Sequence, residues 1–84
     1  MFSPQKIQSI VEEALPGSKA EVHDMTGTND HFQVVVVCPE FEGKGMVTRH
    51  RMVYAALGNA VGAEIHALAL TTLTPTEAAG GNHG

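Results

Sequence analysis

The stretch that decides the fold is His31–Pro39, which reads His-Phe-Gln-Val-Val-Val-Val-Cys-Pro. Valine is branched at Cβ, so four valines in a row favour an extended strand. We predict a strand over His31–Cys38, covered on both faces and ended by Pro39, which has no N–H to donate to a sheet. Before it, Lys19–Met25 alternates weakly and is followed by the polar turn Thr26–Asp30. Two strands joined by so short a turn predict an antiparallel hairpin.

A helix is predicted before this hairpin. Ser3 and Pro4 are residue types typical of the first positions of a helix. Apolar residues then recur at helical spacing and predict a helix over Pro4–Leu15, which ends at Pro16 and Gly17. The apolar stripe consists of Ile7, Ile10, Val11, Ala14 and Leu15.

A second helix and a third strand are predicted after the hairpin. Thr48 is a candidate cap for the helix, whose apolar residues repeat as far as Val61 before Gly62. The segment Glu64–Thr72 then alternates like a strand. Together these elements predict a single two-layer α+β domain with the order αββαβ, a mixed three-stranded sheet and two helices on one face.

The end of the chain carries a helix-start signal. Thr74, Pro75 and Glu77 are spaced as the cap, the first helical residue and the third residue of a capping box. Only a few small residues follow, so we expect a stub of one turn at most. The domain is expected to span residues 1–77, and residues 78–84 to form a flexible tail.

Composition limits the function. Five Lys and Arg against nine Asp and Glu give a net charge of −4, which disfavours nucleic-acid binding, since that affinity comes from a basic surface. A single cysteine, Cys38, excludes an internal disulfide and a zinc site built from several cysteines. The sequence has no apolar run long enough to cross a bilayer and no secretory signal pattern, so we expect a soluble cytoplasmic protein. No catalytic pairing of His with Ser, Asp or Cys is found, so we expect no enzyme.

Several motifs in this order resemble those of BolA-like proteins, from about Ile7 to Glu77. They are His31-Phe32 before the valines, Phe41-Glu42-Gly43-Lys44, Arg49-His50-Arg51-Met52-Val53-Tyr54, Ile65-His66-Ala67-Leu68 and Thr74-Pro75-x-Glu77. The resemblance implies an αββαβ fold with a variable last helix, similar to a class II KH domain. It also implies a non-enzymatic accessory protein.

The resemblance further implies a partner and a shared cofactor. BolA-like chains pair with monothiol glutaredoxins of the CGFS type in a heterodimer that holds a 2Fe–2S cluster. The glutaredoxin supplies its cysteine and a glutathione thiol, and the BolA-like chain supplies the histidine of the Ile-His-Ala-Leu motif, here His66. The implied roles are cluster delivery, iron signalling and, for some members, transcription regulation. No cofactor is expected in the isolated protein.

The second ligand of the implied cluster stays open. In the family it usually comes from the loop between the first two strands, but Met25–Asp30 contains neither Cys nor His. His31 and His23 flank this loop and are the candidates, and they could be neighbours if the hairpin register allows it. The alternatives are Asp30, a ligand from the partner or solvent, and no cluster. Cys38 is expected to be a small core residue instead, on the opposite strand face from His31.

Three of the five basic residues, Lys44, Arg49 and Arg51, fall close together at the predicted start of the second helix. Their charge opposes the helix dipole there, so another factor must favour them. One interpretation is recognition of an anion: a glutathione carboxylate, an acidic partner or phosphate. The other is a solvated cap with one arginine paired to Glu42 or Asp24. Nucleic-acid binding through these residues is the second hypothesis, and a cluster-free scaffold, such as a homodimer, is the third.

Overall fold

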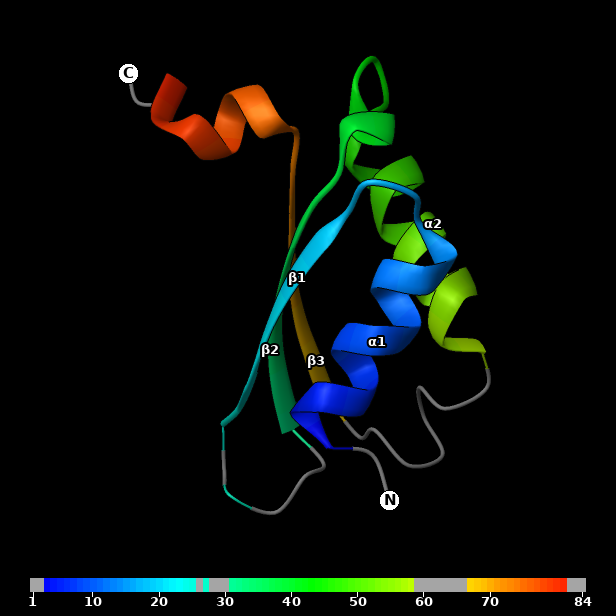
Figure 1. Ribbon diagram of the computed structural model, residues 1–84, viewed down its shortest axis with the longest axis vertical. Coiled ribbons are helices and arrows are strands. Elements are labelled where there is room, and N and C mark those ends of the chain that lie inside the picture. The colour runs from blue at the N-terminus through cyan, green and yellow to red at the C-terminus, as the bar shows by residue number, and fades with distance from the viewer. Residues whose placement is uncertain (1–2, 26, 28–30, 59–66, 82–84) are drawn as a thin grey trace.

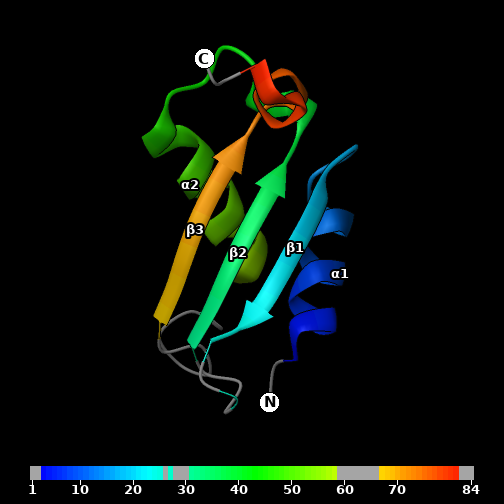
Figure 2. The same cartoon turned by 90° about the vertical axis from the view of Figure 1, so that its left-hand side faces the viewer.

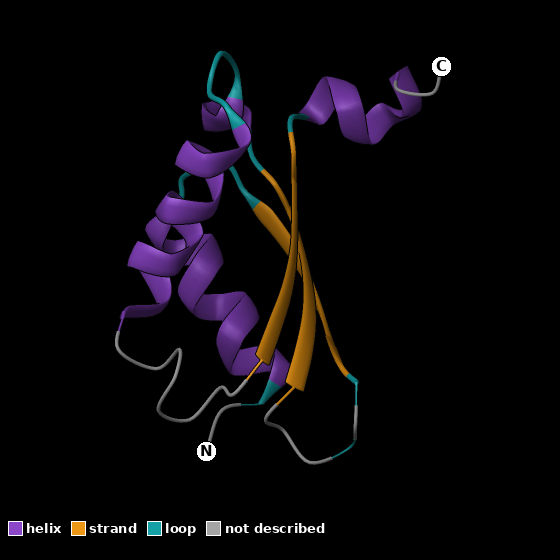
Figure 3. Cartoon of the chain, turned by 180° about the vertical axis from the view of Figure 1, so that it is seen from behind, coloured by secondary structure: helices purple, strands orange, loops and turns teal. Residues whose placement is uncertain are grey.

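The chain folds into two layers, a three-stranded sheet and two helices that cover one of its faces (Figures 1 and 3). The computed structural model describes residues 3–25, 27, 31–58 and 67–81. Helix α1 spans Pro4–Ala14, and strands β1 and β2 span Lys19–Asp24 and His31–Val37. Helix α2 spans Met46–Leu57 and strand β3 spans Ala67–Leu73. The predicted α+β class and the order αββαβ are confirmed.

The sheet is mixed and has the strand order β1-β2-β3 (Figure 2). Strands β1 and β2 form the predicted antiparallel hairpin, in which Val22 faces Val34. Strand β3 runs parallel to β2, with His31 beside Ala67 and Val37 beside Leu73. A parallel neighbour needs a crossover connection, and α2 lies within the one that joins β2 to β3.

The core lies between the sheet and the two helices. Its β2 residues, Phe32, Val34 and Val36, are fully buried. The opposite face of β2 carries exposed Gln33 and half-buried valines, so the prediction that both faces are covered was wrong. The cause is that both long helices pack on the same side and leave the other face open (Figure 2). Among the described residues, the rest of the core consists of Ile7, Val11, Leu15, Ala20, Cys38, Phe41, Val53 and Leu57.

The start of α1 agrees with the prediction, whereas both ends of α2 differ from it. Helix α1 starts as expected, because the Ser3 side chain accepts a hydrogen bond from the Lys6 N–H. Helix α2 instead starts ahead of Thr48, with Gly45 as its cap and no capping side chain. It ends at Leu57, where Gly58 has a φ of 63°, rather than at the predicted Val61. Glycine reaches positive φ without a steric penalty, so Gly58 is a natural end for the helix.

Two short helical segments complete the described chain. A 3₁₀ turn, Pro39–Phe41, follows β2 and buries Phe41 completely. After β3, the chain coils through residues 75–76 into the π-helix Glu77–Gly81, which is kinked at Gly80, where φ is 97°. The helical segment thus continues past the predicted single turn only across this kink. This π-helix projects toward the side of the sheet opposite α1 and α2 (Figures 1 and 3). The domain boundary at residue 77 stays a prediction, and residues 82–84 of the expected tail lie outside the described residues.

Candidate metal-ligand and partner sites

Two of the three candidate ligands lie on the open face of the sheet. His23 is paired with Gln33 rather than with His31, so the two histidines are diagonal neighbours across the hairpin. Side chains alternate between the faces of a strand, and this register places both imidazoles on the same face. Such diagonal positions are typically ~7–8 Å apart. His23 is exposed and His31 is half-buried.

The start of β3 lies beside these histidines. Ala67, the first residue of β3, is paired with His31 on β2. His66, the third candidate ligand, directly precedes Ala67 in the sequence and lies outside the described residues. We call the end of the sheet formed by His23, His31 and Ala67 the histidine end.

The described residues hold no group of three or more His, Cys, Asp or Glu side chains that could bind a metal ion. Cys38 is fully buried, and its thiol points at the Pro16 carbonyl oxygen, 3.8 Å away. Its expected place in the core is thereby confirmed. A metal centre that uses His23 or His31 therefore needs further ligands that do not belong to the described residues.

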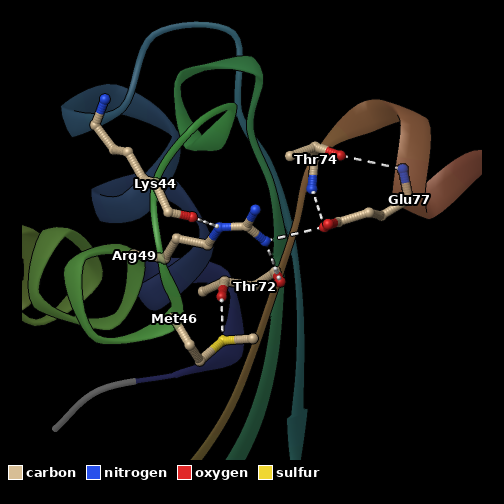
Figure 4. Close-up of polar contacts among 6 residues, drawn as sticks. All are labelled: Lys44, Met46, Arg49, Thr72, Thr74 and Glu77. Carbon is tan, nitrogen blue, oxygen red and sulfur yellow. Dashed lines mark hydrogen bonds and ion pairs between the residues drawn. The ribbon is translucent and has the colours of Figure 1, made fainter. Parts of the chain in front are cut away.

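Arg49 is held inside the protein by groups from three other parts of the chain (Figure 4). Its Nε donates to the Lys44 carbonyl oxygen at 2.8 Å, and its NH1 donates to the Thr72 carbonyl oxygen at 3.4 Å and to Glu77 Oε1 at 2.9 Å. The guanidinium carbon also lies 5.8 Å from the centre of the buried Phe41 ring. Arg49 is only 9% exposed, so these contacts hold it away from solvent. One arginine does pair with a carboxylate of the fold, but the expected partners, Glu42 and Asp24, were wrong.

Glu77 joins this contact to the predicted capping box. Its carboxylate accepts from the Thr74 N–H at 2.9 Å, and its own N–H donates to the Thr74 hydroxyl at 3.1 Å, which confirms the box. The Thr74 N–H and, next, the Arg49 guanidinium favour the charged carboxylate and hold the pKa of Glu77 below its ordinary value. The contact thus ties the π-helix to α2.

Lys44 and Arg51, the other two predicted partner residues, are exposed. Helix α2 contains no Asp or Glu, so no carboxylate of the same helix can neutralise Arg51. Beside them, the His50 and Tyr54 rings meet edge to face at 6.5 Å between centroids. The cluster expected from the sequence therefore divides into one internal residue and two that are open to a partner.

Residues that sequence reasoning missed complete the surroundings of Arg49. Thr72, which supplies a carbonyl oxygen, also donates its hydroxyl to the Met46 sulfur at 3.3 Å. Neither Thr72 nor Met46 had a local signal, because each contact joins residues more than twenty positions apart in the chain. Phe41 has a local signal, because it belongs to the motif Phe41-Glu42-Gly43-Lys44 that resembles BolA-like proteins.

Comparison with known proteins agrees with this architecture. The sequence profile of the family "BolA-like protein" matches residues 2–77. This chain belongs to the BolA-like protein family. Human BolA-like protein 1 is 37% identical over 78 residues, which cover 84% of this chain and 57% of the human protein. The DNA-binding transcriptional regulator BolA of Escherichia coli (strain K12) is 43% identical over 51 residues, 61% of this chain and 49% of that protein.

Solved BolA structures share the fold. A BolA homologue from Coxiella burnetii has a TM-score of 0.76 and 43% identity, and the match covers 94% of this chain and 99% of that one. The BolA domain of SufE1 from Arabidopsis thaliana has a TM-score of 0.77 and 31% identity over 92% of this chain and 98% of that one. Yeast Fra2 has a TM-score of 0.74 and 28% identity, and the match covers 99% of this chain and 94% of that one.

This BolA-like chain spans about half the length of the curated relatives it matches. One relative, the Escherichia coli protein, is named as a transcriptional regulator. In the part of the chain that the structure describes, no helix is long and apolar enough to cross a membrane.

Proposed function

We propose that this BolA-like chain is an iron–sulfur accessory protein that pairs with a monothiol, CGFS-type glutaredoxin. In the heterodimer His66 is a ligand of a 2Fe–2S cluster, whose other iron ligands include the glutaredoxin cysteine and a glutathione thiol. The chain acts by binding, in cluster trafficking or iron signalling, and not as an enzyme. Its likeness to Fra2 and to the BolA domain of SufE1 supports an iron–sulfur-related role.

The observation that carries the proposal is the strand register at the histidine end. His31 is paired with Ala67, the residue that follows His66 in the chain, and His23 is its diagonal neighbour on the same face. The imidazoles of His23 and His31 thus share one face of the sheet beside the start of β3, and His66 directly precedes that strand in the sequence.

The donor set fits a shared cluster better than a metal ion of this chain alone. The described residues offer no complete ligand group, and in the proposed heterodimer the glutaredoxin cysteine and the glutathione thiol complete it together with His66. A neutral imidazole nitrogen can ligate iron, and histidine in place of thiolate raises the reduction potential of a 2Fe–2S cluster. His31 and His23 are the candidates for the second ligand from this chain. His31 is the stronger one because it is paired with the start of β3.

Reconstitution tests this function. The chain is mixed with a CGFS glutaredoxin, iron, sulfide and glutathione, and the absorption and circular dichroism spectra are compared with those of the glutaredoxin alone. We expect a heterodimer whose cluster spectrum differs from that of the glutaredoxin homodimer. His66→Ala is expected to abolish or shift that spectrum, and His31→Ala and His23→Ala are compared beside it.

Gln33→Ala is the matched control, because Gln33 is exposed on the same face and is paired with His23. It should leave the spectrum unchanged. An unchanged spectrum in His66→Ala would reject the ligand assignment. A complex without iron would favour the scaffold hypothesis, and no complex at all would reject the glutaredoxin partnership.

A nucleic-acid-binding regulator is the second candidate, favoured by the name of the Escherichia coli relative. Arg49 is engaged internally, so Lys44 and Arg51 would have to contact the phosphates. Two phosphate contacts predict a slope of only about −2 in log affinity against log salt concentration. A gel shift with duplex DNA at low salt that shows no complex would remove this candidate.

A further inference from the structure

Helix α2 presents most of the exposed large apolar side chains. Among the described residues four such side chains are exposed, and three of them belong to α2: Met46 at 56%, Val47 at 65% and Tyr54 at 38%. Val47 and Tyr54 are seven positions apart, which places them on one stripe of a helix, with Arg51 between them. Removing such side chains from water is favourable, so a cluster of them marks a surface suited to contact.

Charge sets this surface apart from the rest of the molecule. The chain has a net charge of −4, yet α2 has no acidic residue, and Arg51 and nearby Lys44 are exposed. We call the surface formed by Lys44, Val47, Arg51 and Tyr54 the α2 surface. It combines an apolar centre with positive charge, which is complementary to a surface with apolar residues flanked by carboxylates.

The α2 surface starts at the opposite end of the sheet from the histidines. Arg49 and Met46, in the first turns of α2, contact Thr72 near the end of β3, whereas His31 is paired with Ala67 at its start. At about 3.3 Å per residue, Ala67 and Thr72 are roughly 16 Å apart along the strand. Figure 1 shows the start of α2 and the start of β3 at opposite ends of the molecule.

We propose that the α2 surface docks an acidic amphipathic helix of another protein. Apolar side chains of that helix lie along Val47 and Tyr54, and its carboxylates lie near Lys44 and Arg51. The proposal rests on α2 and does not depend on the proposed cluster. If both hold, the chain has two separate docking sites and can join two proteins.

A protein partner fits this surface better than nucleic acid does. Affinity for nucleic acid comes mainly from neutralising many phosphates, and only two basic side chains are exposed here. The exposed large side chains that accompany them on the α2 surface, Val47 and Tyr54, are aliphatic and aromatic. Burial of apolar area with a few charged residues at the rim is typical of contact between proteins.

A designed peptide tests the surface. The probe is an acidic helical peptide of about five turns, with leucines along one face and glutamates on both sides of them. It is titrated into the isotope-labelled full chain, and amide chemical shifts are followed by NMR. We expect the changes to centre on Val47, Arg51 and Tyr54. Val47→Glu and Arg51→Glu are each expected to weaken binding about tenfold or more, because they place negative charge against the glutamates.

The chain offers matched controls for both substitutions. Met25→Glu alters the remaining exposed large apolar side chain, 60% exposed after β1, and Lys19→Glu reverses an exposed basic residue on β1. Both should leave peptide binding unchanged. A second peptide with lysine in place of glutamate should not bind.

Three results would overturn the proposal. The first is the absence of shifts in α2 with the acidic peptide. The second is equal binding of the lysine peptide, or equal loss of binding in the Met25→Glu control. The third is a short DNA duplex that shifts the same amides at physiological salt while the acidic peptide does not, which would assign the surface to nucleic acid.

Discussion

Arg49 and Arg51 are two positions apart on α2 and have opposite surroundings. Arg49 satisfies two backbone carbonyl oxygens and one carboxylate, whereas Arg51 is exposed. Arg49→Ala leaves the Thr72 carbonyl oxygen without this donor in a buried place and removes the contact with Phe41. We expect it to lower the free energy of unfolding by about 2–3 kcal/mol. Urea denaturation measures this loss.

Arg51→Ala is the control for this prediction and should change the free energy of unfolding by less than about 0.5 kcal/mol. Arg49→Lys should recover only part of the stability, because an ammonium group cannot reproduce the planar fork of donors. Equal losses in Arg49→Ala and Arg51→Ala would contradict the structural role of Arg49.

Glu77 predicts a dependence of stability on pH. Its pKa is lowered in the folded state, so its contribution is fully present above the unfolded pKa, about 4.3 for glutamate. The contribution is lost as the pH falls through the lower, folded pKa. Glu77→Gln lacks the charge, so the stability difference between the wild type and this variant should shrink as the solution becomes acidic.

Urea unfolding over a pH series down to roughly pH 3 follows this difference. Glu13→Gln is the control, since Glu13 is an exposed residue of α1. A difference between wild type and Glu77→Gln that stays constant across the series would rule out a contribution from the ionised carboxylate.

At the scale of the element, helix α2 begins without a side chain that caps its first N–H groups. Gly45 caps the helix without a side-chain hydrogen bond, and its φ of −75° and ψ of 170° suit any residue. A Cβ placed on Gly45 would meet nothing within 4 Å. Gly45→Asp supplies an oxygen for the free N–H groups and a negative charge at the positive end of the helix dipole.

We expect Gly45→Asp to be more stable to unfolding than Gly45→Ala by about 1 kcal/mol. The alanine variant is the necessary comparison, because it makes the same backbone change without a capping oxygen. Thermal and urea unfolding of the two variants measure the difference. If both variants have the same stability, the first turn of α2 gains nothing from a cap.

Sequence reasoning placed the elements well where a local pattern decides them. The valines of β2 and the apolar stripe of α1 predict their elements, and the Thr74–Glu77 capping box was found from spacing alone. The start of α2 was missed because Thr48 is a good cap by residue type, yet the helix begins at Met46. Cap preference ranks residue types at the first position of a helix, but it does not determine at which residue the loop ends and the helix begins.

At the scale of the whole molecule, contacts between residues close in the sequence could be predicted, whereas contacts between residues far apart in the sequence could not. The Arg49–Glu77 contact joins residues 28 positions apart, and no local pattern identifies such a pair. The shared face of His23 and His31 depends on the hairpin register, which the sequence of the connecting turn does not determine. His66 lies outside the described residues, so its role stays a prediction from the family resemblance.

The separation of the two ends leads to a prediction about the whole molecule. If the histidine end holds the cluster and α2 docks a different protein, changes at one end should leave the other intact. Val47→Glu and Arg51→Glu should therefore give the same cluster spectrum with a glutaredoxin as the wild type, whereas His66→Ala should not. Conversely, His66→Ala should bind the acidic peptide with wild-type affinity.

Spectroscopy of the reconstituted heterodimer and peptide titration of the free chain, run on the same three variants, measure this independence. Both substituted residues on α2 are exposed. Glutamate is favourable at Val47 in the first turn and is a good helix former at Arg51, so the variants should fold. Loss of the cluster in Val47→Glu or Arg51→Glu would mean that the glutaredoxin itself contacts α2. The chain would then have one extended interface rather than two.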